Sequence, residues 1–266
     1  MSQPLAGMMG AMTITLAVAN QKGGVAKTTS VASLGVALAE LGQRVLLVDL
    51  DPQACLTFSL GIDPEDLEVS VHQVLTGVAE PEDVIVTTED GVDLLPATIE
   101  LARAEAELLT RTGREQVLKA ALEDVKGYDW ILLDCPPSLG VLTVAALTAA
   151  RGVVIPLQCE TLSHRGVGQL LDTVHDVRRF TNRKLQVWGV LPTLYDGRTN
   201  HSRVVLDTIS DTYKLDVIQP PIPKTIKFAE APAAGRSIMS HARNSKGAQA
   251  YRQAADSLVL RSMLKD

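Results

Sequence analysis

The chain has 266 residues, of which 46% are hydrophobic and only 3% aromatic, and its formal net charge is −6. It contains no uninterrupted apolar run of about 18 residues, which argues against a membrane-spanning helix. Its three cysteines show no CxxC spacing, which indicates reduced thiols in a cytoplasmic protein. The overall acidity disfavours nucleic-acid binding unless positive charge is concentrated on one face.

Apolar runs and helical periodicity alternate along the chain. Strands are predicted near residues 13–19, 44–48, 92–96, 129–134, 152–157, 186–191 and 216–219, and helices near 28–41, 99–124, 140–150, 164–180, 200–213 and 245–262. This alternation predicts an α/β fold, in which a doubly wound, mostly parallel sheet is flanked by helices on both faces. Ligands of such sheets bind at the carboxyl ends of the strands.

Two regions fall outside the alternation. Residues 1–12 lack the positive charge of a signal peptide, and they are expected to be a flexible tail or a stretch upstream of a start at Met12. Residues 61–90 are acidic and poorly periodic, which predicts a peripheral insertion of a short helix and loops. We therefore expect a single domain over residues 13–266.

A glycine-rich loop follows the first predicted strand and leads into the first predicted helix. The loop reads Lys22-Gly23-Gly24-Val25-Ala26-Lys27-Thr28-Thr29. Such a loop cradles phosphates, because its N–H groups and the helix N-terminus present partial positive charge. Lys27 is expected to reach the β and γ phosphates, Thr28 to place its hydroxyl on Mg²⁺, and Thr29 to approach the α phosphate.

Acidic residues follow two further buried strands. Asp49 and Asp51 lie two residues apart at the end of the second strand, so both carboxylates are expected on one face. Asp134 ends the apolar run 130–133 and is expected to hold a water bound to Mg²⁺, a cation that prefers oxygen ligands and retains part of its hydration shell. The predicted metal residues are therefore Thr28, Asp49 and Asp134.

Positive charge is concentrated in the C-terminal third. Residues 198–252 hold 9 Lys and Arg against 4 Asp and Glu, whereas residues 1–150 hold 8 against 21. A local basic face of this kind is what phosphate binding requires, and this distribution keeps DNA open as a partner.

Together these segments resemble the deviant Walker A, A′ and B motifs of the ParA/MinD family of P-loop ATPases, in its Soj-like chromosome and plasmid partition branch. Stretches 154–160, 191–199 and 222–232 add to the likeness, which covers nearly all of residues 13–262. The resemblance implies a P-loop NTPase of the SIMIBI type that uses ATP and Mg²⁺.

The resemblance also implies roles for individual residues. Lys22 matches the signature lysine that reaches the partner's phosphates in a nucleotide-sandwich homodimer, and Asp51 matches the residue that positions the attacking water. Lys22, Lys27 and Asp51 are thus the predicted catalytic residues. Thr193, Leu194 and Pro223 lie in segments that resemble the adenine pocket. The positions where the family contacts DNA non-specifically correspond to Arg198, Lys224, Lys227 and Arg236.

The implied function is an ATP-driven partition switch in the cytoplasm, associated with the nucleoid. An ATP-bound dimer would bind DNA and be released by hydrolysis that a ParB-like partner stimulates. The alternative is a MinD-like membrane-associated ATPase, although residues 254–266 have few basic residues and no Phe or Trp. An iron–sulfur carrier would need paired cysteines, and a specific repressor would need an operator-binding helix-turn-helix.

Ala26 departs from the family pattern, which has glycine at this position. A left-handed backbone here would cost alanine about 1–2 kcal/mol, whereas a negative φ would make alanine nearly neutral. Ala26 is expected to slow or retune nucleotide turnover without abolishing nucleotide binding.

Overall fold

The computed structural model describes residues 13–160, 163–198 and 200–264. The predicted 1–12 tail lies outside these residues. The central sheet has the strand order β3-β4-β2-β5-β1-β6-β7, and every pairing is parallel except that of β3 with β4. The strands are β1 (Ile14–Val18), β2 (Val45–Asp49), β3 (Val86–Thr87), β4 (Asp93–Leu95), β5 (Trp130–Asp134), β6 (Gly152–Gln158) and β7 (Gln186–Thr193).

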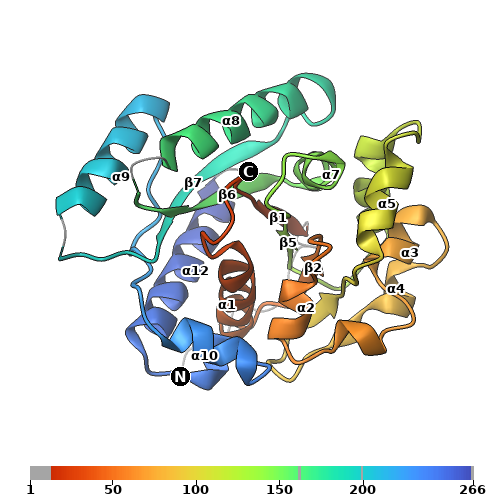
Figure 1. Ribbon diagram of the computed structural model, residues 1–266, viewed down its shortest axis with the longest axis horizontal. Helices are drawn as coiled ribbons and strands as arrows, with labels where there is room; N and C mark the ends of the chain where they lie inside the picture. Colours follow the sequence, from red (N-terminus) through yellow and green to blue (C-terminus); the bar gives the residue numbers. More distant parts are fainter. Residues whose placement is uncertain (1–12, 161–162, 199, 265–266) are drawn as a thin grey trace.

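Helices cover both faces of this sheet (Figure 1). The α-helices are α1 (Lys27–Glu40), α2 (Cys55–Ser59), α3 (Val71–Thr76), α4 (Pro81–Val84), α5 (Leu101–Leu108), α6 (Val117–Glu123), α7 (Val141–Ala149), α8 (Ser163–Phe180), α9 (Asn200–Tyr213), α10 (Lys227–Ala233), α11 (Ile238–His241) and α12 (Lys246–Leu264). Two short 3₁₀ turns, η1 (Pro64–Asp66) and η2 (Arg114–Gln116), complete the order. The predicted doubly wound α/β fold is confirmed.

Strand alternation divides the buried side chains between two cores. Ala17 of β1 and Ile131 of β5 face the core that α3 and α5–α9 cover. Leu16 and Trp130, their neighbours in the chain, face the core beneath α1, α11 and α12. Because both faces are covered, the central strands are continuous apolar runs, which explains why the sequence predicted them well.

Three predicted elements differ from the structure. The helix expected over 99–124 is broken after α5, because Gly113 adopts a left-handed φ of 71°. The strand expected at 216–219 makes only an isolated bridge, between Val190 and Val217, because Pro220 and Pro221 follow and have no N–H to continue a ladder. The 61–90 insertion holds η1, α3, α4 and the antiparallel edge strand β3, more regular structure than one short helix.

The sheet tolerates no side chain at Gly152, the first residue of β6. A Cβ there would lie 2.2 Å from Nε1 of Trp188, and Trp188 is itself fixed edge-on against Trp130. We expect Gly152→Ala to lower the free energy of unfolding by about 1–3 kcal/mol, because the buried indole must move. Urea denaturation measures this change. Adding Trp188→Phe should restore part of the loss, whereas an unchanged midpoint in Gly152→Ala would contradict the clash.

Candidate functional site

The glycine-rich loop between β1 and α1 is held by hydrogen bonds to β6 and β7. The Asn20 side chain donates to the carbonyl of Pro156 in β6 at 2.7 Å and accepts from the Lys22 N–H at 3.0 Å. From β7, the Thr193 hydroxyl donates to the carbonyl of Val25 at 2.9 Å. Thr193 is fully buried, so it supports the loop as well as bordering the cavity. The loop is therefore held in shape before any ligand binds.

The loop leaves open space where phosphates would pack. A Cβ built on Gly23 or Gly24 would meet no atom within 4 Å, and Gly24 has a φ of 72°, which suits glycine. Lys27 is buried, and its ammonium donates to the Lys22 carbonyl at 3.2 Å. Burial lowers the pKa of Lys27, and the nearby Asp134 offsets part of this effect. A desolvated ammonium beside an open, N–H-lined loop favours an anionic ligand.

Ala26 adopts the left-handed conformation, with φ 63° and ψ 37°, and immediately precedes α1 without a side-chain capping bond. Of the two geometries weighed from sequence, the strained one is therefore present. Ala26→Gly should relieve about 1–2 kcal/mol of backbone strain in the folded chain. The glycine also makes the unfolded chain more flexible, which lowers stability by about 0.4–1 kcal/mol. We therefore expect the free energy of unfolding to rise by about 0.5–1 kcal/mol. Chemical denaturation without nucleotide measures it.

Ala37→Gly, in the interior of the same helix, is the matched control and should destabilise by about 1 kcal/mol. ATP affinity and hydrolysis of Ala26→Gly test the expectation that this residue retunes turnover. Identical values in both measurements would show that the strain has no functional consequence.

Asp49 and Asp134 end adjacent strands in register and are both fully buried. Asp49 accepts hydrogen bonds from the Thr57 N–H and hydroxyl at 2.9 and 2.8 Å and from the Asp51 N–H at 3.1 Å. Burial raises the pKa of Asp49 to about 6. Asp49 does not line the cavity. Its carboxylate is engaged in hydrogen bonds that anchor α2 and the Asp51 turn. Asp134 does not line the cavity either, and the metal roles of both residues stay predictions.

Asp134 differs from Asp49 in lacking partners. Neither of its carboxylate oxygens makes a hydrogen bond of ordinary geometry within the described part of the chain. Burial, and next the Asp49 carboxylate, raise the pKa of Asp134 well above its usual range, and the Thr28 hydroxyl and Lys27 offset part of the rise. An unpartnered buried carboxylate close to a threonine hydroxyl fits a hydrated Mg²⁺ ion, which would neutralise charge on the phosphates. Thr28 and Asp134 would hold this ion with waters and phosphate oxygens.

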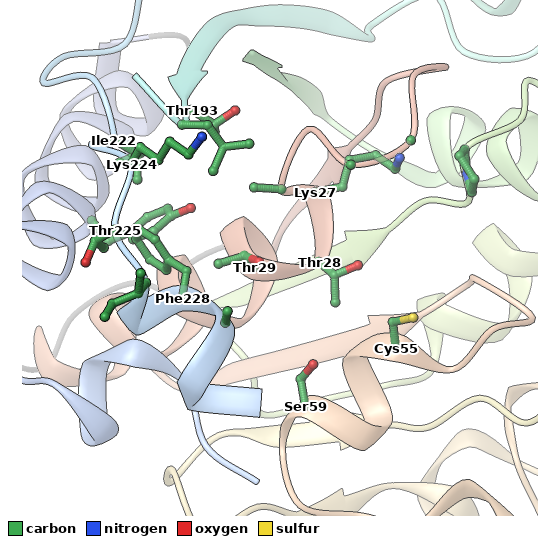
Figure 2. Close-up of a pocket in the computed structure, with 18 of the residues that line it drawn as sticks. Lys27, Thr28, Thr29, Cys55, Ser59, Thr193, Ile222, Lys224, Thr225 and Phe228 are labelled. Atoms are coloured by element: carbon green, nitrogen blue, oxygen red, sulfur yellow. The ribbon is translucent and has the colours of Figure 1, made fainter. Parts of the chain in front are cut away.

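A cavity of about 770 Å³ opens in front of the loop. Figure 2 shows Lys27, Thr28 and Thr29 facing it from the start of α1, Cys55 and Ser59 from α2, and Ile222, Lys224, Thr225 and Phe228 from the opposite side. One end is polar, with Lys27, Thr28 and Asp51, and the other is mainly apolar. A cavity with a phosphate cradle at one end and an apolar slot at the other matches a purine nucleotide.

The cavity gathers most of the predicted nucleotide residues. It is lined by Gly23, Gly24, Ala26, Lys27, Thr28, Thr29, Asp51, Thr193 and Leu194. Pro223 and Val25 do not line it, whereas the adjacent Ile222 and Thr225 do. Sequence reasoning missed Phe228 and Tyr251, whose rings meet edge-on at 5.8 Å between centroids. Tyr251 reaches the site through its hydroxyl, 2.9 Å from that of Ser30, a contact across 221 residues that no local pattern reveals.

Lys22 belongs to the glycine-rich loop but does not line the cavity. Its ammonium pairs with the Glu160 carboxylate at 2.5 Å, and its side chain is 36% exposed. The four predicted DNA residues all follow β7 in the sequence. Three of them have carboxylate partners: Arg198 pairs with Asp196, Lys227 with Glu230, and Arg236 with Glu89. The fourth, Lys224, lines the cavity.

Comparison with known proteins identifies the family. A family model described as an AAA domain matches residues 13–187. The sporulation initiation inhibitor protein Soj of Bacillus subtilis is 46% identical over 89% of this chain and 94% of its own length. The chromosome-partitioning ATPase Soj of Thermus thermophilus is 44% identical over 96% and 98%. The chain belongs to the ParA/MinD family of ATPases, in its Soj-like branch. This confirms the family predicted from the motifs.

Solved structures agree on the fold and its ligands. A Mycobacterium smegmatis protein described as cobyrinic acid a,c-diamide synthase, with ADP and magnesium bound, is 58% identical and has a TM-score of 0.86 over 95% of this chain and 96% of its own. MinD of Pyrococcus horikoshii, with Mg-ADP, is 28% identical with a TM-score of 0.75 over 96% and 99%. This chain is thus an ATPase of the family, with ATP and Mg²⁺ as its cofactors.

Proposed function

We propose that this ATPase is a DNA-partition switch. ATP bound in the cavity would draw two chains into a homodimer in which each Lys22 contacts the partner's phosphates. The dimer would bind DNA non-specifically, in the cytoplasm on the nucleoid, until hydrolysis stimulated by a ParB-like protein releases it. The observation that supports the proposal is Lys22, a cation of the glycine-rich loop that is 36% exposed and does not line its own cavity.

The chemistry of this switch rests on residues of the cavity. Lys27 would hold the β and γ phosphates, and Thr28 would orient the metal-bound end of the ATP. Asp51 lines the cavity and accepts a bond from the Gln53 N–H at 3.0 Å, which leaves its second oxygen to position a water for in-line attack. Mg²⁺, when bound, would neutralise negative charge that develops on the phosphates.

The deciding experiment measures the association state by sedimentation, with ATP, with ADP and without nucleotide, and then binding to a non-specific DNA duplex across a salt series. The proposal expects dimers only with ATP, and DNA binding that is steeply salt-dependent and much tighter with ATP than with ADP or without nucleotide. A chain that stays monomeric with ATP, or that binds DNA equally with ADP, would refute the switch.

The 58% identical structure is named as an amide-forming synthase. The cysteines of this chain give that activity less support than they would if one of them were an activated thiol. Amidation from glutamine would need an activated thiol. Burial, followed by the Asp51 carboxylate, raises the pKa of Cys55 in the cavity. Burial likewise raises the pKa of Cys159, to about 11, and that of Cys135. No cysteine of the described residues therefore has the low pKa of a nucleophile.

A MinD-like membrane role is the second candidate, because Leu260, Met263 and Leu264 are exposed on the last turn of α12. No helix among the described residues is long and apolar enough to cross a membrane. Flotation with anionic liposomes in the presence of ATP separates the two functions: flotation lost in Leu260→Ser with Leu264→Ser would favour the membrane role.

The ion pair between Lys22 and Glu160 should oppose dimer formation, because Lys22 must leave Glu160 to reach the partner's phosphates. We expect Glu160→Gln to lower the dissociation constant of the ATP-bound dimer about two- to fivefold, the range of a partly exposed ion pair. Sedimentation at several protein concentrations measures it. Glu107→Gln, which removes the ion pair with Arg103, is the control and should change nothing. Weaker dimers in Glu160→Gln would show that Glu160 supports the interface.

A further inference from the structure

A cluster of exposed cations lies where α8 turns into β7. It consists of Arg178, Arg179, Arg183 and Lys184 around the aromatic ring of Phe180, and we call it the α8–β7 corner. In a chain of net charge −6, four cations within seven residues are a strong local departure. The corner adjoins Gln186, the first residue of the edge strand β7, whose other end carries the cavity residue Thr193. It therefore lies at the end of β7 opposite the nucleotide cavity, along the top of the view in Figure 1.

The charges of this corner are not neutralised by the chain itself. Arg179, Arg183 and Lys184 make no ion pair with any residue that the structure describes. The Arg178 Nε donates to the backbone carbonyl of Leu185 at 2.7 Å. The carboxylate next to the cluster, Asp176, pairs with His175 at 3.7 Å. The C-terminal cations Arg198, Lys227 and Arg236, in contrast, each have a carboxylate partner. Among the described residues, an external anion that binds Arg179, Arg183 or Lys184 therefore displaces no ion pair of these side chains.

The aromatic ring of Phe180 in this corner is unusually exposed to solvent. Phe180 is 71% exposed, and the Arg179 guanidinium lies 5.1 Å from the centroid of its ring. This contact holds two planar groups side by side on the surface. Aromatic rings and guanidinium planes are the groups on which unpaired bases stack. One exposed ring among four cations offers too little apolar area for a membrane anchor, which requires a whole apolar helix face.

We propose that the α8–β7 corner is a DNA-binding surface that works without nucleotide. The four cations would contact phosphates of the backbone, and Phe180 with Arg179 would provide a stacking platform for an exposed base. Because the corner lies at the amino end of β7, away from the carboxyl end that lines the cavity, its binding is independent of ATP and of dimer formation. It does not rest on the proposed partition switch.

The test measures binding of the nucleotide-free full chain to short labelled DNA, both duplex and single-stranded, by fluorescence anisotropy between about 50 and 200 mM salt. Replacing Arg183 and Lys184 by alanine is expected to lower the salt-dependence slope by about 2, one for each lost phosphate contact. Phe180→Leu should weaken single-strand binding about fivefold or more and leave the slope unchanged. Both changes should also appear in a Lys22→Ala background.

The matched control is a chain with Arg103→Ala and Arg114→Ala. It loses the same two charges, but at exposed arginines that pair with Glu107 and Glu115. This control should keep the wild-type slope. The proposal is overturned if the Arg183 and Lys184 variant binds as wild type does, if the control loses as much affinity, or if the corner residues affect binding to anionic vesicles and not to DNA. If the chain forms no dimers with ATP but the corner variants behave as expected, the partition switch is refuted and this proposal stands.

Discussion

Lys22→Ala is expected to keep ATP binding while losing ATP-dependent dimers and the DNA binding that depends on them. The phosphate contacts within one chain come from Lys27, the loop N–H groups and Thr28, and none of these needs the Lys22 side chain. In the dimer, however, each Lys22 would be a charged contact to the partner's nucleotide. Removing one partner of such a contact costs about 2–5 kcal/mol, so the dimer dissociation constant should rise at least about 30-fold.

Sedimentation with ATP measures the dimer, and equilibrium binding of a fluorescent ATP analogue measures the nucleotide site. Lys126→Ala is the control, because that lysine is exposed and donates only to the carbonyl of Glu123. Dimers that persist in Lys22→Ala would refute the role of Lys22 across the interface. Loss of ATP binding together with the dimers would instead place Lys22 in its own chain's site.

Asp134→Asn should have opposite effects on stability and on ligand binding. Without Mg²⁺, the buried carboxylate makes no hydrogen bond of ordinary geometry among the described residues and lies beside Asp49, so a neutral amide should raise the free energy of unfolding by about 1–3 kcal/mol. The amide is a poorer partner for hydrated Mg²⁺, so Mg²⁺-dependent ATP affinity should fall about 10- to 100-fold. A stabilised protein that binds ATP poorly is the expected signature.

The stability gain should depend on pH in a defined direction. Burial raises the pKa of Asp134 in the folded chain above its unfolded value of about 4. The folded state therefore retains the proton longer, and the stability that this provides is present at low pH and lost as pH rises through the folded pKa. Asp134→Asn should thus gain most over wild type at alkaline pH, measured by urea denaturation without Mg²⁺. Asp129→Asn, at the other end of β5, is the control.

The phosphate end of the site was predictable because local sequence determines it. A glycine-rich loop between a buried strand and a helix leaves few other conformations, and the strands that carry Asp49 and Asp134 are continuous apolar runs. The loop and the two strand ends could therefore be located from the sequence, whereas the roles of their residues stay predictions. What the pattern could not reveal is which carboxylate is satisfied: Asp49 is bonded by Thr57, eight residues later, whereas Asp134 has no such donor.

The base end of the site was less predictable because distant segments build it. Tyr251 enters from α12 only because that helix packs on α1, and Phe228 enters from α10, an unpredicted helix. The predicted Pro223 lies one residue from the lining residue Ile222. Residues from 222–229 do line the cavity, but the direction of each side chain within an irregular segment has no periodicity from which to infer it.

The unusual start of α1 gives the nucleotide a structural as well as a chemical role. Ala26 provides no side-chain oxygen to accept the first N–H groups of the helix. A helix whose first turn has unfilled donors is an incomplete element, and a phosphate placed there completes it as a capping residue would. ATP is then part of the secondary structure of this protein, and each hydrolysis and release returns α1 to an unfinished helix.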